Sequence, residues 1–252
     1  MKRKIVIGNW KMNKSICKSV EMVKEMLNEG YGMSRIRNTE IILAPSYLAL
    51  SEVKRVCGST ACISLGAQDA YYIQSGNYCG AVSPRMLSEV CSYVFVGHSE
   101  LRTHLENTDE IVNLKVKACI EEGMIPIFCV GESMEVQKAG KTCAHIRNQM
   151  QKGLDGCIPK EMIILYEPVW ALGSGKVPAI AQVEEIMGKI ADILSVMYGA
   201  DLCCQIRSVY AGSVTPENAR QYARLPHVDG VAVGTASLRT ESFMKIIQEV
   251  EK

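Results

Sequence analysis

The sequence lacks a long hydrophobic run and lacks a large net charge of either sign. No apolar stretch approaches the roughly 20 residues that a membrane-spanning helix needs, and the basic residues 2–4 precede an apolar run too short for a signal peptide. The 28 Lys and Arg residues nearly balance 27 Asp and Glu, for a net charge of +1. We therefore expect neither a membrane nor a nucleic acid as a partner.

The 11 cysteines contain no CxxC pair, and the four histidines show no zinc-ligand spacing with them. Cys203 and Cys204 are adjacent, which suits neither a metal knuckle nor a redox motif. Several others, such as Cys62 and Cys129, lie in apolar runs, as small buried side chains do. This pattern predicts free thiols, a cytoplasmic location, no bound metal and no cofactor.

Short apolar runs, rich in Val and Ile, recur along the whole chain, and most end in Gly or Pro. They cover residues 4–9, 40–45, 61–67, 92–97, 124–131, 162–168, 206–212 and 229–234. Because these runs are continuously apolar and do not alternate with polar residues, they indicate strands of a sheet that is buried on both faces, and hence parallel.

Helical periodicity fills several intervals between these runs. It covers Ser15–Glu29, Glu110–Glu121, Ala181–Met197 and Glu241–Val250, with Thr240 as the expected N-cap of the last helix. Strands that alternate with helical or loop segments predict an α/β fold, a (β/α)8 TIM barrel of eight parallel strands. A doubly wound sheet is the alternative, but no GxGxxG motif follows the first strand. Since no linker, repeat or low-complexity segment is visible, we expect residues 1–252 to form a single domain.

In such a barrel the active site gathers at the carboxyl ends of the strands. Polar or glycine residues stand there: Asn9, Lys11, Gln68, His98, Ser99, Glu100, Gly131, Glu132, Glu167, Gly212, Ser213, Gly234 and Thr235. Taken one at a time, each has an ordinary structural explanation, such as a solvated lysine or a helix cap. Their joint occurrence predicts a catalytic site.

One strand end is the most informative. Its last residue, Glu167, precedes Pro168, which favours an extended backbone at Glu167. An apolar, Gly-rich loop follows, which suits a lid that closes over a small substrate and excludes water. The lid residues are Pro168, Val169, Trp170, Ala171, Leu172, Gly173, Ser174, Gly175 and Lys176. For this segment alone, a surface loop with one solvated carboxylate is the alternative.

The residues after the last two strands suggest a phosphate cradle, in which backbone N–H groups and helix dipoles face the anion. Its candidates are Ser213, Gly234 and Thr235, with a further N–H from Gly173 in the lid. The remaining groups suit removal of a proton next to a carbonyl, with Glu167 as the base and His98 and Lys11 polarising the oxygen. We therefore expect a small phosphorylated substrate.

Five motifs together resemble the triosephosphate isomerase family. NWKMN (9–13), GHSE (97–100), FCVGE (128–132), YEPVWALGSGK (166–176) and AGSV (211–214) occur in that family's order and span nearly the whole chain. The resemblance implies interconversion of dihydroxyacetone phosphate and D-glyceraldehyde 3-phosphate through an enediolate, a step of glycolysis and gluconeogenesis. This family is itself a standard example of pKa tuning and of lid closure.

The resemblance also implies a role for each site residue. Glu167 moves the proton between adjacent carbons, and a neutral His98 donates a hydrogen bond to the developing oxyanion. Lys11 supplies positive charge, and Asn9 orients the carbonyl side. The supporting residues are Ser99, Glu100 and Glu132, the phosphate is held by Gly173, Ser213, Gly234 and Thr235, and Tyr210 and Ser213 catch the closed lid.

Several positions depart from the family pattern. Cys79, Ala81, Leu101 and Asn107 replace residues that are usually a Thr, two Glu and an Arg, near the family's subunit interface. We expect a homodimer through loop 68–81 with a less charged interface. Ala211 and Thr235 each replace a Gly, and a Cβ costs roughly 1 kcal/mol or more where the backbone needs a positive φ. Slower or less complete lid closure is therefore expected.

Two hypotheses stand beside an authentic triosephosphate isomerase. Ala211 and Thr235 motivate a sister isomerase for another short ketose phosphate, of the erythrulose phosphate type. The altered interface motivates a catalytically weak paralogue kept for binding, although every expected chemical residue is present.

Overall fold

The computed structural model describes residues 2–203 and 205–252, so Cys204 lies outside the described residues. Parallel strands pair in chain order from β1 to β8, and β8 pairs with β1 to close a barrel. The strands are β1 (Lys4–Asn9), β2 (Thr39–Ala44), β3 (Ile63–Ala67), β4 (Tyr93–Val96), β5 (Ile125–Val130), β6 (Met162–Tyr166), β7 (Ile206–Tyr210) and β8 (Gly230–Val233). The predicted (β/α)8 barrel is confirmed, and closure by β1 and β8 rules out the doubly wound alternative.

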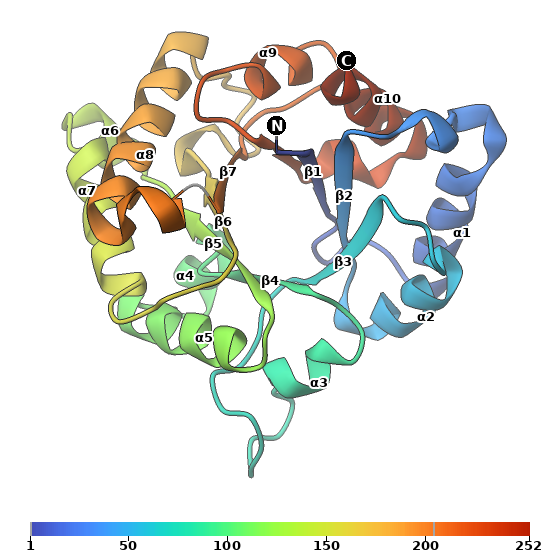
Figure 1. The fold of residues 1–252 in the computed structure, drawn as a ribbon, viewed down its shortest axis with the longest axis horizontal. Coiled ribbons are helices and arrows are strands. Elements are labelled where there is room, and N and C mark those ends of the chain that lie inside the picture. The colour runs from blue at the N-terminus through green and yellow to red at the C-terminus, as the bar shows by residue number, and fades with distance from the viewer. Residues whose placement is uncertain (1, 204) are drawn as a thin grey trace.

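Helices surround the barrel in a ring (Figure 1). They are α1 (Ile16–Leu27), α2 (Tyr47–Cys57), α3 (Pro84–Ser88), α4 (Ser99–His104), α5 (Asp109–Glu121), α6 (Met134–Lys138), α7 (Thr142–Gly153), α8 (Ile180–Cys203), α9 (Ala219–Ala223) and α10 (Thr240–Glu251). Short 3₁₀ turns are η1 (Glu29–Tyr31), η2 (Met33–Arg35), η3 (Val169–Ala171) and η4 (Thr235–Leu238). The four helices predicted from periodicity correspond to α1, α5, α8 and α10, and α8 is interrupted near its end by non-helical backbone at Gly199.

The predicted N-cap of α10 is wrong. Thr240 is the first helical residue, and Arg239 holds the cap position without a side-chain hydrogen bond. The Thr240 hydroxyl donates a hydrogen bond to the carboxylate of Glu25 on α1. A contact between two helices therefore outweighs the local preference of threonine for capping.

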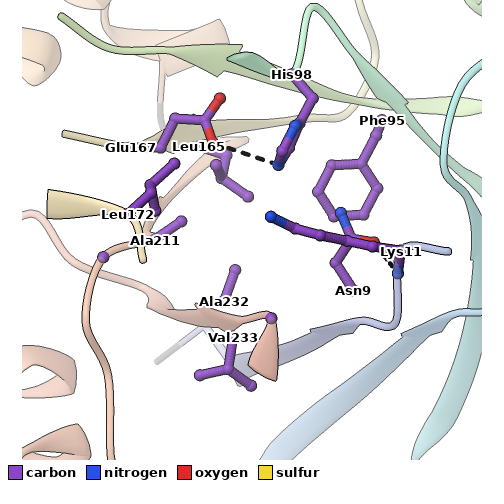
Figure 2. A pocket seen from close by; sticks show the side chains of 12 residues that line it. Asn9, Lys11, Phe95, His98, Leu165, Glu167, Leu172, Ala211, Ala232 and Val233 are labelled. Carbon is purple, nitrogen blue, oxygen red and sulfur yellow. Dashed lines mark hydrogen bonds and ion pairs between the residues drawn. The ribbon is translucent and has the colours of Figure 1, made fainter. Parts of the chain in front are cut away.

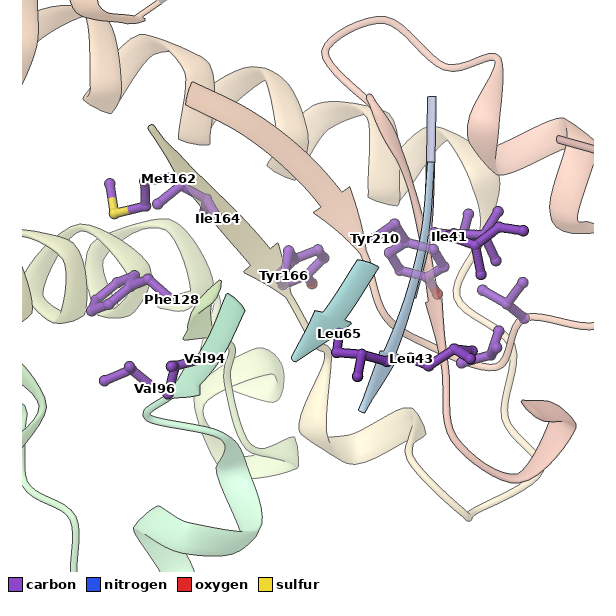
Figure 3. Close-up of a cluster of buried hydrophobic side chains, with 14 of the residues drawn as sticks. Ile41, Leu43, Leu65, Val94, Val96, Phe128, Met162, Ile164, Tyr166 and Tyr210 are labelled. Carbon is purple, nitrogen blue, oxygen red and sulfur yellow. The ribbon is translucent and has the colours of Figure 1, made fainter. Parts of the chain in front are cut away.

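Side chains alternate along each strand and so build two separate cores. Figure 3 shows the outward set, in which Leu43, Val94, Phe128 and Ile164 face the helices. The inward set fills the barrel, with members on seven of the strands: Ile5, Ile7, Ile42, Ala44, Tyr93, Phe95, Ile127, Cys129, Ile163, Leu165, Val209 and Ala232, with Ala211 just after β7. Burial on both faces explains why the strands are continuously apolar in sequence.

A half-buried ion pair closes the amino-terminal end of the barrel interior. Arg207 on β7 and Glu40 on β2 lie 2.8 Å apart, and the hydroxyls of Tyr93 and Ser64 donate to the same carboxylate. Burial opposes ionisation of Glu40, but the hydrogen bonds from Tyr93 and Arg207 and the guanidinium charge outweigh it and lower the pKa of Glu40. This network lies at the opposite end of the strands from the predicted catalytic residues.

Candidate active site

A pocket of about 340 Å³ opens at the carboxyl ends of the strands, where the sequence predicts the active site (Figure 2). Among the predicted catalytic residues, Asn9, Lys11, His98 and Glu167 all line it. The rest of its lining is mostly apolar and consists of Phe95, Leu165, Leu172, Ala211, Gly212, Ala232, Val233 and Gly234. Charged groups in a small apolar pocket meet little competition from water, which strengthens their action on a substrate.

Lys11 adopts a left-handed backbone conformation, with φ of 50°, directly after β1. Two side chains hold this conformation, which is costly for a residue with a Cβ. The Asn9 Oδ1 atom accepts the Lys11 N–H at 3.0 Å, and the Gln68 amide donates to the Lys11 carbonyl at 3.0 Å. The ammonium Nζ lies 2.6 Å from Glu100 Oε1. Burial opposes ionisation of Glu100, but the hydrogen bond and charge of Lys11 outweigh it and lower the pKa of Glu100.

His98 is the N-cap residue of α4, and this position fixes its tautomer. The backbone N–H of Glu100 donates to Nδ1 of His98 at 3.3 Å. Because Nδ1 accepts this hydrogen bond, the proton of the neutral ring is on Nε2. Nε2 faces the carboxylate of Glu167, with 3.4 Å between Nε2 and Oε2. The imidazole therefore presents an N–H donor to the pocket.

Glu167 is buried, with only 2% of its surface exposed, at the end of β6. Its Oε1 accepts the backbone N–H of Ser99 at 2.7 Å, while Oε2 is the oxygen near His98. The neighbouring strand approaches closely, since a Cβ on Gly131 would lie 1.7 Å from the Glu167 carbonyl oxygen. Glycine at position 131 therefore sets the place of the carboxylate.

Glu132 anchors the start of the lid. Its Oε1 accepts the indole N–H of Trp170 at 2.8 Å and the hydroxyl of Tyr166 at 3.3 Å, and its carbonyl accepts the N–H of Val169 at 3.1 Å. Burial raises the pKa of Glu132 and outweighs the hydrogen bonds from Trp170 and Tyr166, which favour the ionised form. The predicted support of the lid base by Glu132 thus has a direct counterpart in these contacts.

The predicted lid leaves the barrel through η3 and returns near Lys176. The Ser213 hydroxyl lies within hydrogen-bonding distance of two lid carbonyls, 3.2 Å from Ala171 and 2.9 Å from Lys176. Gly173 and Gly175 have φ of 64° and 72°, which favours glycine at both positions. Residues 173–177 are exposed, whereas Leu172 lines the pocket together with Glu167.

The phosphate-cradle candidates do not all share the pocket. Gly234 lines it, while Gly173 is exposed in the lid, Ser213 contacts the lid backbone and Thr235 is exposed at the start of η4. The structure shows no hydrogen bond from Tyr210 to the lid among the described residues. The Tyr210 ring lies 4.4 Å from that of Tyr222, and in this conformation Ser213 is the one of the two predicted residues that contacts the lid.

The substituted glycine positions carry no backbone strain in this conformation. Neither Ala211 nor Thr235 has a positive φ. The Ala211 N–H donates to the carbonyl of Tyr166 at 2.7 Å, and its side chain belongs to the inward core. The next residue, Gly212, does require glycine, since a Cβ there would lie 2.0 Å from the Tyr210 hydroxyl.

One of the substituted residues near loop 68–81 has a buried polar atom without a hydrogen-bond partner. Asn107 is buried, and its amide donates to the carbonyls of Leu101 and Leu105 at 3.4 and 3.0 Å. Its Oδ1 atom is buried without a hydrogen-bond partner. Arg102, next to Leu101, is paired with Asp109 at 2.7 Å.

Sequence reasoning missed the apolar wall of the pocket. Phe95, Leu165, Ala232 and Val233 line it, and none of them was a candidate. The alternation of inward and outward side chains could have found the first three, because each is the last inward residue of its strand.

Within residues 2–203 and 205–252, no cluster of three or more His, Cys, Asp or Glu side chains is arranged to hold a metal ion. In the same residues, no helix combines the length and apolarity needed to cross a membrane.

Comparisons with known proteins agree with the motifs. The family model described as triosephosphate isomerase matches residues 4–250. The chain belongs to the triosephosphate isomerase family. Curated triosephosphate isomerases include one from Prosthecochloris aestuarii, 39% identical with both chains covered completely, and one from Chlorobium phaeobacteroides, 41% identical over 98% of each. A crystal structure of triosephosphate isomerase from Bartonella henselae aligns with a TM-score of 0.88 at 32% identity, covering 99% of this chain and 100% of that one.

These findings confirm the predicted family and the predicted class of enzyme, an isomerase. They do not favour the sister isomerase or the catalytically weak paralogue, since these curated relatives and the solved structure are all named triosephosphate isomerase.

Proposed function

We propose that the chain interconverts dihydroxyacetone phosphate and D-glyceraldehyde 3-phosphate. The observation that carries this proposal is the facing pair of Glu167 and His98, a carboxylate and an N–H donor 3.4 Å apart in a small pocket that also holds Lys11. A base beside an oxyanion donor is the arrangement that proton transfer next to a carbonyl requires.

In the proposed reaction, the Glu167 carboxylate removes a proton from the carbon next to the carbonyl. The electron pair of the broken C–H bond forms the C=C bond of an enediolate, and the carbonyl oxygen gains the negative charge. The Nε2–H of His98 and the ammonium of Lys11 stabilise this oxygen. A second proton moves from the neighbouring hydroxyl to the former carbonyl oxygen. Glu167 then returns its proton to the carbon that bore the carbonyl, and the former hydroxyl oxygen becomes the new carbonyl, without a cofactor.

The phosphate would lie on the side of Gly234, next to the lid. Gly234 adjoins Lys11, since a Cβ on Gly234 would lie 3.5 Å from Lys11 Cε. Closure of the lid would bring Gly173 to the same group, with Ser213 and Thr235 as further donors. Contacts of Ser213 with both lid carbonyls support this arrangement.

A coupled assay on D-glyceraldehyde 3-phosphate tests the function. Turnover that is lost in Glu167→Gln, a variant of nearly unchanged shape, is the expected result. Activity at background level in the folded wild type would refute the proposal.

We further propose that residues 1–252 form one domain, which acts in the cytoplasm in glycolysis or gluconeogenesis. Pairing of β1 with β8 supports a single unit, and the ten described cysteines are all free, which supports a reducing compartment.

We also propose a homodimer through loop 68–81. This loop projects from the barrel (Figure 1) and exposes Tyr78 and Cys79 at its end. Met12 and Leu48, in other loops and helix starts, are also largely exposed, at 98% and 79%. Exposed apolar side chains of this size suit an interface.

A further inference from the structure

The apolar layer beneath the reacting groups is uneven in size. The last inward side chains of the even-numbered strands are Ala44 on β2, Phe95 on β4, Leu165 on β6 and Ala232 on β8. In a (β/α)8 barrel, alternate strands contribute the side chains of one layer. Two of these four are alanines, so the aromatic ring of Phe95 supplies most of the bulk of the layer.

Phe95 lies on one particular side of the pocket. Figure 2 shows its ring on the side of Asn9, Lys11 and His98, across from Glu167 and Leu172. The ring meets the His98 imidazole edge to face, with 6.2 Å between the ring centroids and 74° between the planes. It therefore lies next to the group that binds the substrate oxygen.

The ring has little freedom to move aside. Phe95 is 1% exposed, and its backbone is paired with that of Ile127 on β5 in the middle of the barrel sheet. Close-packed interiors accept an extra methylene only at the cost of strain. Phe95 is thus a fixed part of the pocket wall.

We propose that Phe95 is a specificity-determining residue that limits the substrate to three carbons. This inference rests on the proposed function. When the phosphate is held beside Gly234 and the reacting carbons lie between Glu167 and His98, the far end of the substrate points to Phe95. A ketose phosphate with one more carbon between the phosphate and the two reacting carbons would push its reactive end into the ring.

The test compares two substrates in one variant. The value of kcat/KM is measured for two ketoses, dihydroxyacetone phosphate and D-erythrulose 4-phosphate, in the wild type and in Phe95→Val. We expect the four-carbon to three-carbon ratio to rise about tenfold or more, the range in which one methylene is discriminated by an apolar pocket. A ratio between two substrates is not affected by a loss of activity common to both.

A matched control is Ile127→Val, which trims a buried side chain of the same inward core that does not line the pocket. Its ratio should equal that of the wild type. If Phe95→Val is poorly folded, Phe95→Leu is measured by the same criterion.

An unchanged ratio in folded, active Phe95 variants would overturn the inference and leave the proposed function intact. Loss of activity toward both substrates in both folded Phe95 variants would also overturn it, because the ring would then serve His98 alone. Absence of activity toward the three-carbon substrate in the wild type would instead refute the proposed function.

Discussion

The Nε2 atom of His98 lies 3.4 Å from Oε2 of Glu167, while Nδ1 of the same ring accepts the N–H of Glu100. The two nitrogens therefore have separate tasks, one fixed by the start of α4 and the other directed at the pocket. An N–H that is directed at the pocket in this way can stabilise an oxyanion that forms there.

The first prediction concerns this donor. His98→Asn should lower kcat for D-glyceraldehyde 3-phosphate by about 10²–10³, the usual cost of removing one oxyanion donor. His104→Asn is the matched control, since His104 is exposed in the last turn of the same helix and does not line the pocket. Steady-state kinetics on both variants check the prediction, and equal rates for the two would contradict it.

A second prediction concerns the glycine that sets the position of Glu167. Gly131→Ala should lower kcat by at least about tenfold, because its Cβ would lie 1.7 Å from the Glu167 carbonyl oxygen and must displace that backbone. Gly188→Ala is the control, since a Cβ there meets nothing within 4 Å, and alanine favours the helix by up to about 1 kcal/mol. Wild-type kinetics in Gly131→Ala would show that the neighbouring strand does not position the base.

Much of this architecture follows from local sequence. The apolar runs located all of β1–β8 to within two residues at each end, because a strand buried on both faces must be apolar throughout. Continuous apolar composition does not show which side chains point inward, so only the alternation of side chains along β4 could have assigned Phe95 to the pocket.

The parts of the site that depend on one segment could be predicted from the sequence. The parts that depend on contacts between residues far apart in the sequence could not. Glu167 and the lid were visible in a single segment. The left-handed conformation of Lys11 depends on Gln68, which is 57 positions further along the chain. Likewise, Thr240 contacts Glu25 on another helix, which local capping preference cannot foresee.

A third prediction concerns the ion pair inside the barrel. Arg207→Met leaves the half-buried Glu40 without its cation and should lower the free energy of unfolding at pH 7 by about 2 kcal/mol. The partners lower the pKa of Glu40 in the folded state, so their stabilisation is present above the unfolded pKa and is lost as the pH falls through the folded pKa. The difference between wild type and variant should therefore shrink below about pH 4.5, the ordinary range for a glutamate.

Urea denaturation at pH 7 and at pH 4 measures both values. The double variant Glu40→Gln, Arg207→Met should be less destabilised at pH 7 than Arg207→Met alone, because no charge is left unpaired. A loss in Arg207→Met that is equal at the two pH values would show that packing, and not charge, is what Arg207 contributes.

A fourth prediction addresses lid closure. In the present conformation Ala211 has no positive φ, so any cost of its Cβ arises only if the backbone after β7 changes when the lid closes. Ala211→Gly should then raise kcat or tighten binding of a transition-state analogue, by about fivefold for a cost of roughly 1 kcal/mol. Stopped-flow kinetics and inhibitor titration measure the two quantities, and no change in either would show that Ala211 does not hinder closure.

The last prediction concerns the proposed homodimer. Cys79, Ala81, Leu101 and Asn107 are uncharged, and the one charged residue of loop 68–81, Asp69, is paired with Lys115. Asn107 donates to local backbone carbonyls, while its Oδ1 has no hydrogen-bond partner. An interface built on apolar contacts loses little when salt screens charges, whose range at 0.15 M ionic strength is about 8 Å. We therefore expect a dimer whose dissociation constant changes little between low and high salt, as measured by sedimentation equilibrium.

A matched variant, Ala81→Glu, would add one carboxylate per subunit to the loop and should weaken association more at low than at high salt. A wild-type monomer would contradict the proposed homodimer. Strong salt dependence of the wild-type dimer would contradict an apolar interface, because the loop would then associate through charges that its sequence does not supply.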